Sequence, residues 1–588
     1  MGIAPEDLEL PEGGEGRTVR QSALERPTEA EQRLNQTLDM MAEEGEALKA
    51  ELYDEWDKNI MFFEGRQWES PRPDPLTTVT VNNIYRILIQ EAALLADYSP
   101  TYIIKARDSD KWGALAAVLA TIAEAIWQMR GHGALIPQAA LDLAAFNKSF
   151  WKVLWKPELA WGLGDISIER VDPGEVSVDN VASLEEASFI RHRQVMPVWK
   201  ARQMFPAFAD RIVADDSVTM PTSLQRDAYL RLPRPRTRVG ERKGAVERVI
   251  VEEWLIRDPT MDEAGKAKYP SGRLITRVGE AAKVIVQDIK YPWYDPWPGP
   301  WVEMTGPRIR GFWGVPEISQ SRSLQELLNV LFSILADQGR LQGSGIWIVD
   351  DQALRPDALE ILKTQTSGVV TKKPGTEVRR EAGAPIGEGM LEYTRMVNQA
   401  MEFIHGLLDT SYGRVPRGVT AGAAIEALQQ GTAALVRLRS GEIQRALQKA
   451  GQMVVARVLQ FYTNKRIFFL TGQDGRIIDT VFDPEKLGLL DAEEGIDELV
   501  KQFTIAVQSG SELALSKEKG YALHTALYGM GAIDRKALLD ALEYPNREEI
   551  IERMNLNMTL GLNPGAAGPS IRGRGSKIIE SAIDRGVI

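Results

Sequence analysis

The sequence contains no cysteine, which excludes disulfide bonds, thiol nucleophiles and metal sites that depend on cysteine. Histidine is also scarce, and no two histidines have the spacing of metal ligands on one helix; the four are His132, His192, His405 and His524. The phosphate-binding GxxxxGK[ST] motif, the HExxH zinc motif, the GxSxG nucleophile motif and the glycine pattern of dinucleotide-binding folds are absent. We therefore expect no enzymatic activity, no metal site and no cofactor.

Long apolar runs are lacking as well. The most apolar stretch, Ala114–Trp127, is interrupted by Glu124 and is shorter than the roughly 20 residues that a membrane-spanning helix needs. The first residues lack the basic and apolar regions of a signal peptide. These features predict a buried helix at 114–127 and an intracellular protein that does not associate with membranes.

The charge balance is acidic, with a formal net charge of −12 over 588 residues. A surface that binds nucleic acid along its whole extent would be basic, so this balance argues against such a protein. It leaves room for local basic patches, or for a channel that must not hold DNA tightly. The length exceeds that of a single core and predicts several subdomains.

Hydrophobic periodicity predicts an α+β protein in which helical and strand-rich segments alternate. Residues 1–28 are polar and glycine-rich and are expected to be disordered. Helices are expected at 29–63, 84–97, 111–130, 135–146 and 199–205. Strands are expected at 77–81, 102–106, 151–155, 164–169, 176–179, 187–195, 246–257 and 273–289, followed by a packed turn rich in proline and tryptophan at 291–301.

Residues 314–462 are the most unusual part of the sequence. The pattern predicts a helix at 315–342, a strand at 346–349, a helix at 390–408, a loop at 409–420 and a helix at 421–462. The last helix would run for about 40 residues without proline, against a mean helix length of about 11–12 residues. Three glycines are positions at which it could bend or divide: Gly431, Gly441 and Gly451.

After this stretch the sequence predicts a hairpin at 467–470 and 477–482, a strand at 503–507 and helices at 516–530, 534–542 and 547–556. A glycine- and proline-rich linker at 561–575 would lead to a short last helix at 576–585.

This order of elements resembles the portal (head–tail connector) proteins of tailed double-stranded DNA bacteriophages. Four local stretches carry the resemblance. They are Val81-Asn82-Asn83-Ile84 before an apolar helix that ends near Tyr98-Ser99-Pro100, Gly164-Asp165-Ile166 leading to Val171-Asp172-Pro173, Gly311-Phe312-Trp313-Gly314-Val315-Pro316 before Leu324-Gln325-Glu326-Leu327-Leu328-Asn329, and Val507-Gln508-Ser509-Gly510-Ser511.

The resemblance implies a portal fold with an α/β wing, a two-helix stem, a small β-containing clip and a helical crown. On this chain the implied segments are a disordered tail (1–28), wing (29–313), first stem helix (314–343), clip (344–388), second stem helix (389–408), tunnel loop (409–420), long helix (421–462), wing return strands (463–516) and crown with C-terminal tail (517–588).

The resemblance also implies a function. Portals form rings, usually dodecamers, at one vertex of the capsid, through which DNA enters and leaves. Expected partners are further copies of the chain, double-stranded DNA, the terminase large subunit, head-completion adaptor and tail proteins, and the major capsid and scaffolding proteins. The expected location is the virion, with assembly in the host cytoplasm, and no membrane is involved.

Charged residues in the implied stem, loop and clip are the candidate functional residues. DNA-contacting residues of the tunnel loop are expected at Arg414 and Arg417. Acids that line the channel and repel phosphate are expected at Glu326, Asp337, Glu392, Glu402 and Asp409, although exposed helix positions are often acidic for solubility alone. Docking residues of the clip are expected at Lys372, Lys373, Arg379 and Arg380, which could instead protect a strand edge from unwanted pairing.

Two other functions are compatible with the sequence. One is a different structural or scaffold component of a virion that makes no contact with DNA. The other is a metal-dependent DNA-processing enzyme that uses scattered carboxylates such as Asp350-Asp351 or Glu43-Glu44. Adjacent carboxylates are common on solvated loops and helix faces, and no third partner with metal-ligand spacing is visible, which disfavours the enzyme.

Overall fold

The structure is a computed structural model of the 588-residue chain. Apart from isolated positions, it describes residues 28–74, 76–96, 100–215, 247–261, 265–344, 346–350, 372–381, 387–406, 422–471, 477–487, 495–509 and 524–542. The chain divides into two compact units, Met1–Lys465 with Asp483–Gln508, and Arg466–Phe482 with Ser509–Ile588. Each unit is described by itself.

Helix α2 (Glu29–Phe63) opens the first unit and begins with a capping box. The Thr28 hydroxyl accepts the amide hydrogen of Glu31, and the Glu31 carboxylate accepts that of Thr28, so two of the unpaired amides at the helix start are satisfied. The predicted helix at 29–63 has these same bounds. Its inner face carries Leu38 and Trp56, which are buried in two separate hydrophobic clusters.

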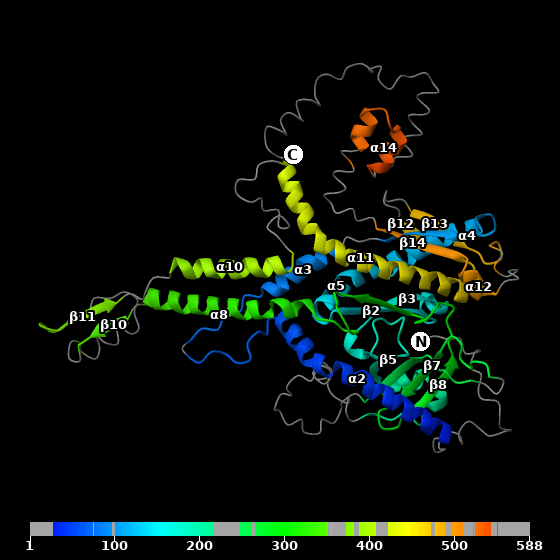
Figure 1. The fold of residues 1–588 in the computed structure, drawn as a ribbon, viewed down its shortest axis with the longest axis horizontal. Coiled ribbons are helices and arrows are strands. Elements are labelled where there is room, and N and C mark those ends of the chain that lie inside the picture. Colours follow the sequence, from blue (N-terminus) through cyan, green and yellow to red (C-terminus); the bar gives the residue numbers. More distant parts are fainter. Residues whose placement is uncertain are drawn as a thin grey trace. The chain divides into compact units, whose positions relative to one another are not determined.

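Two antiparallel sheets form the β-rich body of this unit (Figure 1). The larger sheet has the order β4-β5-β6-β7-β8, and the smaller has the order β3-β2-β9. The strands are β2 (Lys148–Lys156), β3 (Asp165–Val171), β4 (Val176–Val178), β5 (Phe189–Pro197), β6 (Arg248–Ile256), β7 (Arg273–Val278), β8 (Val284–Lys290) and β9 (Trp301–Thr305). A short helix, α6 (Val198–Met204), follows β5.

Aromatic side chains fill the space between α2 and the smaller sheet. Trp56 contacts Phe146 and Trp313 edge to face, and Phe150 stacks on Phe312. Trp301 closes the same cluster. This packing fixes the segment 306–316, which leads directly into the first long helix of the arm described below.

The first unit also contains three further helices and a two-stranded sheet. They are α3 (Asn83–Ala96), α4 (Ser109–Met129), α5 (Leu135–Phe146), β1 (Pro100–Ala106) and β14 (Phe503–Ser509), of which β1 pairs with β14. Helix α4 is long and apolar enough to cross a membrane, but half of that apolar window is buried inside this fold. Leu119 and Ile122 are among its buried residues, as in the core helix that the sequence predicts.

Two antiparallel helices, α8 (Glu317–Ser344) and α10 (Glu388–Ile404), lie side by side and form an arm, with the hairpin of β10 (Ile346–Val349) and β11 (Val378–Glu381) at its end (Figure 1). Helix α11 (Gly422–Phe461) then spans 40 residues. It is a single helix, so none of its glycines divides it. Gly451 instead allows close packing, because a β-carbon there would lie 2.4 Å from the Tyr102 ring.

The second unit contains the hairpin of β12 (Arg466–Thr471) and β13 (Ile477–Phe482) and the helix α14 (Arg535–Ala541). The sequence predicts these two strands and the strand at 503–507 as one return segment. The structure divides them, because β14 pairs with β1 in the first unit, where a short helix, α12 (Ile496–Val500), precedes it.

Two expectations are wrong. Residues 77–81 form no strand, because their backbone is hydrogen-bonded to side chains of α8 instead of to another strand. The helix expected at 390–408 ends at Ile404, where His405 caps it.

Candidate functional site

The arm is held together by an apolar seam between its two helices. Leu328 and Leu331 of α8 and Val397 and Met401 of α10 are buried together, in a cluster that continues into α3 and α5. The seam recurs at spacings of three and four residues on both helices, the pattern by which helices pack along their length. The arm is therefore continuous with the core of the first unit.

A polar ladder joins the outer side of α8 to the extended segment 76–83, which we call the strap. The amides of Thr77, Val79, Val81 and Asn83 each donate to a side chain of α8. The acceptors and donor–acceptor distances are Asp337 Oδ1 at 2.8 Å, Ser333 Oγ at 3.0 Å, Asn329 Oδ1 at 3.1 Å and Gln325 Oε1 at 3.1 Å. Every second residue of an extended chain thus meets every fourth residue of a helix.

The rungs are connected to one another and to the body. Gln325 Nε2 donates to the Val81 carbonyl at 2.7 Å, and Asn329 Nδ2 donates to Gln67 Oε1 at 2.6 Å. Gln325, Asn329 and Ser333 are fully buried or nearly so. A buried polar group left without its partner would lower the free energy of unfolding by about 1–3 kcal/mol. The network therefore favours a single register of the strap along α8.

Asp337 closes the outer end of the ladder. Arg72 donates to its second carboxylate oxygen at 2.9 Å and also to the Thr77 carbonyl. The hydrogen bond from the Thr77 amide, supported by the Thr77 hydroxyl and Arg72, holds the pKa of Asp337 below its usual range. The carboxylate is consequently ionised at neutral pH and occupied by partners of its own chain.

An ionic junction joins the inner ends of the arm to α11. The Glu317 carboxylate contacts His405 Nδ1 at 2.5 Å and also pairs with Arg439 of α11. His405 Nε2 lies 2.9 Å from the Ser321 hydroxyl, and Arg439 also meets Glu91 of α3. Burial lowers the pKa of Arg439 to about 10. Four helices therefore meet at one set of charges, directly before residues 409–420.

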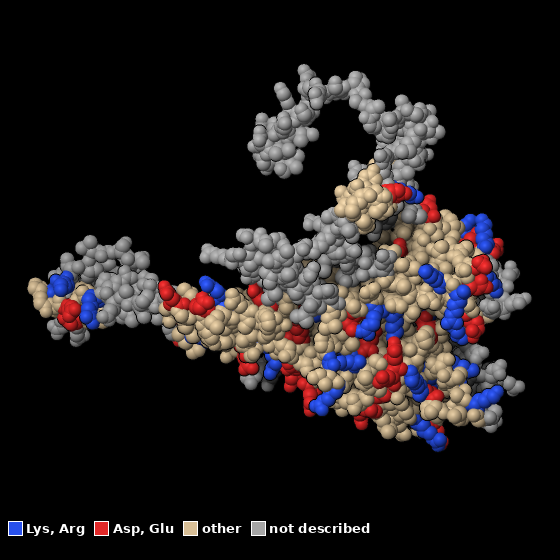
Figure 2. Space-filling model, turned by 45° about the horizontal axis from the view of Figure 1, so that its top comes forward, with Lys and Arg blue, Asp and Glu red and all other residues tan. Residues whose placement is uncertain are grey.

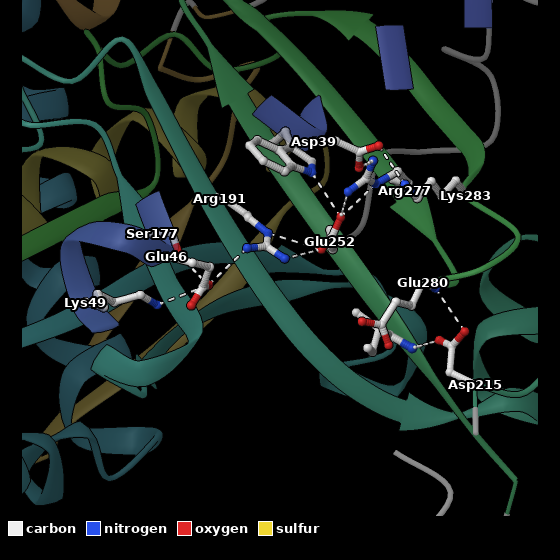
Figure 3. Close-up of polar contacts among 12 residues, drawn as sticks. Asp39, Glu46, Lys49, Ser177, Arg191, Asp215, Glu252, Arg277, Glu280 and Lys283 are labelled. Carbon is white, nitrogen blue, oxygen red and sulfur yellow. Dashed lines mark hydrogen bonds and ion pairs between the residues drawn. The ribbon is translucent and has the colours of Figure 1, made fainter. Parts of the chain in front are cut away.

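A second ionic network attaches α2 to the larger sheet (Figure 3). Glu252 on β6 lies between Arg191 on β5 and Arg277 on β7, with contacts of 2.5 and 2.7 Å. Arg191 reaches Glu46 of α2 at 3.0 Å, and Arg277 reaches Asp39 of α2 at 2.7 Å. Although burial opposes ionisation, the two guanidinium groups hold the pKa of Glu252 below its usual range.

Lys49 is the most deeply buried charge of this network. Its ammonium donates to the Gly174 carbonyl at 3.1 Å and lies 3.5 Å from Glu46. Burial lowers its pKa to about 8. These groups pair with one another across the helix and the sheet, so we assign them a structural role.

The four predicted channel acids within the described residues lie at three kinds of position. Glu326 is exposed on the side of α8 that faces away from α10, and Glu392 is exposed on the side of α10 that faces away from α8. They point in opposite directions, so one straight channel wall cannot contain both. Asp337 belongs to the ladder, and Glu402 pairs with Arg86 of α3 at 2.7 Å.

The predicted clip residues lie on the hairpin at the end of the arm. Lys372, Lys373 and Arg379 are exposed. Lys372 donates to the Thr376 carbonyl at 2.7 Å across the turn, and Arg379 pairs with Ile348 in the sheet register. Arg380 pairs with Trp347, and its side chain lies outside the described residues, as do Asp409, Arg414 and Arg417.

Among the described residues, no group of three or more histidines and carboxylates is arranged to hold a metal ion. The architecture is thus a body of two sheets and a long two-helix arm that ends in a hairpin. Comparison with family models matches residues 38–568 to the phage P22-like portal proteins. This chain belongs to the P22-like phage portal protein family. No curated protein matched the sequence.

Membership in the portal family places the chain among the structural components of a phage capsid, at the portal vertex, and not among enzymes. The ladder of this portal protein was missed in the sequence. Its signal is nevertheless present, since Gln325, Asn329, Ser333 and Asp337 repeat every four residues along the helix. Such a polar stripe predicts a partner, but not that the partner is residues 77–83.

Proposed function

We propose that this portal protein forms a ring whose central channel carries double-stranded DNA into and out of the capsid. The arm is the observation that supports this proposal. Helix α8 has 28 residues and thus a length of about 42 Å, enough to line a passage through a protein shell. Its firm attachment to strap, α3 and α11 suits a wall that must resist a moving polymer.

The acidic balance of the chain supports the same proposal. A ring of copies that each carry a net charge of −12 repels the phosphate backbone, which lowers the friction on passing DNA. Glu326 or Glu392, depending on which helix faces the axis, would supply the channel-facing acid, together with Asp409. Arg414 and Arg417 would contact DNA where the channel is narrowest.

The hairpin at the end of the arm would be the docking clip. Lys372, Lys373 and Arg379 form an exposed basic surface there, suited to acidic surfaces of the terminase large subunit during packaging and of a head-completion adaptor afterwards. Replacing all three with alanine should weaken terminase binding without changing ring assembly. Unchanged binding would show that these clip residues do not form the terminase-docking surface.

Electron microscopy of the purified chain tests the proposal directly. Rings with an axial hole about as wide as a DNA duplex are expected, and particles that stay monomeric would contradict a portal channel. Arg414→Ala with Arg417→Ala should preserve the rings and reduce packaging or retention of DNA. The matched control is Arg66→Ala, which removes an exposed arginine that pairs with Glu64 on the body. If the loop variant fails to assemble, those two arginines are structural.

A further inference from the structure

The arm carries an apolar surface that nothing described in the same chain covers. Besides the seam toward α8, helix α10 has a second stripe, at spacings of three and four residues, made of Tyr393, Met396, Ala400 and Phe403. Met396 is 58% exposed and Phe403 is 73% exposed, and Tyr393 is exposed as well. Figure 2 shows few charges along the middle of the arm, with red and blue side chains gathered toward its end.

The neighbouring face of α8 extends the same surface. Val330 is exposed, and Leu327 and Ile334 are partly exposed, on a side of α8 that lies next to the seam. At about 100° per residue, this side of α8 and the stripe of α10 turn toward the same side of the antiparallel pair. Apolar side chains that repeat every three or four residues on two packed helices are typical of a helix–helix contact.

The opposite side of the arm carries a different surface. Asn83 and Arg86 of α3 bind Asn398 and Glu402, which lie on the side of α10 away from the stripe. Next to them, Tyr85 is 48% exposed and contacts the Phe63 ring at a centroid distance of 5.3 Å. One arm therefore has the apolar stripe on one side and an exposed tyrosine on the other.

An ion pair places both surfaces at a similar height along the arm. Arg86 binds Glu402 at 2.7 Å, and these two residues are the sequence neighbours of Tyr85 and Phe403. Bonds from the same two segments reach consecutive turns of α8, at Ser321 and Gln325. Copies placed side by side at equal height would thus bring the Phe403 of one copy next to the Tyr85 of the next.

We propose that the stripe of Tyr393, Met396 and Phe403 is the surface on which a second copy of this chain packs its strap side, with Phe403 against Tyr85 of the neighbour. The inference rests on the proposed ring. Because the stripe and the surface around Tyr85 lie on different sides of one arm, the contact is heterologous. It repeats from copy to copy until the ring closes.

The absence of cysteine makes the contact directly testable by crosslinking. Phe403→Cys with Tyr85→Cys in one chain, treated with a short bismaleimide after assembly, should give a ladder of covalent oligomers. A one-to-one mixture of the two single variants should give covalent species that include dimers joined only between unlike chains. The matched control, Phe403→Cys with Met129→Cys, uses an exposed methionine at the end of α4 and should give no ladder.

The outcomes separate this inference from the proposed ring. If the unmodified chain forms no oligomer, the proposed function fails first. If rings form and the double variant does not crosslink, the contact is wrong and the ring stands. Crosslinked dimers of Phe403→Cys alone would show two stripes meeting face to face, which also overturns the proposal. As a second measurement, Phe403→Glu and Tyr85→Glu should each leave the far-ultraviolet circular dichroism spectrum unchanged and abolish rings.

Discussion

The Asp337 carboxylate accepts the amide hydrogen of Thr77 at 2.8 Å, although the two residues are 260 positions apart in the sequence. This contact ends a ladder in which the side chains of one helix satisfy the backbone of an extended strap. It also means that an acid which sequence reasoning assigns to the channel is used within its own chain. Whether it additionally faces DNA stays a prediction.

The centre of the ladder should be sensitive to loss of a polar side chain. Asn329→Leu would leave the Val81 amide and the Gln67 Oε1 without their partners in a buried site. We expect destabilisation of about 2–4 kcal/mol and faster hydrogen exchange at Val81. The control Glu326→Ala, one turn away and exposed, should change stability by less than about 0.5 kcal/mol. Equal effects of both variants would show that the ladder does not stabilise the arm.

The outer rung should depend on pH. The pKa of Asp337 is lowered in the folded state, so its contribution to stability is present above the unfolded value of 3.8 and is lost as the pH falls through the lower folded value. Asp337→Asn should therefore melt at a lower temperature than the unmodified chain at pH 6, with the difference shrinking below about pH 4. A difference that stays constant down to pH 2 would contradict this assignment.

Lys49 should make stability depend on pH in the alkaline range. Its pKa falls from 10.5 to about 8 on folding, so the folded state disfavours the charged form and stability rises as the pH increases from about 8 toward 10.5. The gain is of the order of 3 kcal/mol at most. Lys49→Met should remove this rise, measured by urea unfolding at pH 7.5 and pH 10. Lys58→Met, on the same helix, serves as the control.

Glu252 should be the least replaceable acid in the body. Glu252→Ala would leave Arg191 and Arg277 buried without the carboxylate between them, and loss of one partner from a buried ion pair costs about 3–5 kcal/mol. The expected result is poor expression or a large fall in the melting temperature. Glu158→Gln removes an exposed acid in the turn after β2 and should behave like the unmodified chain. A mild effect of Glu252→Ala would show that Asp39 and Glu46 suffice.

Much of the fold was readable in the sequence because it depends on local periodicity. The bounds of α2 follow from its capping box and its apolar repeat, and the lengths of α8 and α11 follow from long stretches without proline. The resemblance to portal proteins rested on the order of these elements, and the family match over residues 38–568 confirms it.

The strap shows where local reasoning fails. Residues 77–81 are rich in threonine and valine, as a strand would be, but in the fold they lie against a helix whose side chains bind their amides. Strand propensity predicts an extended backbone, but it does not predict which groups will form hydrogen bonds with that backbone.

The amino-acid sequence by itself determined the classes that are excluded, the order of helices and strands, and the family, since composition, periodicity and motif order are properties of the chain alone. Tertiary structure alone decided which charges remain available. Asp337 and Glu402 look like Glu326 and Glu392 in the sequence, yet the first two are bonded to Arg72 and Arg86 of distant segments. Glu326 and Glu392 are exposed, and Glu392 pairs with Arg395 of its own helix. Partners that are hundreds of residues apart come together only through packing, and packing therefore selects the residues that a neighbouring copy or DNA can meet.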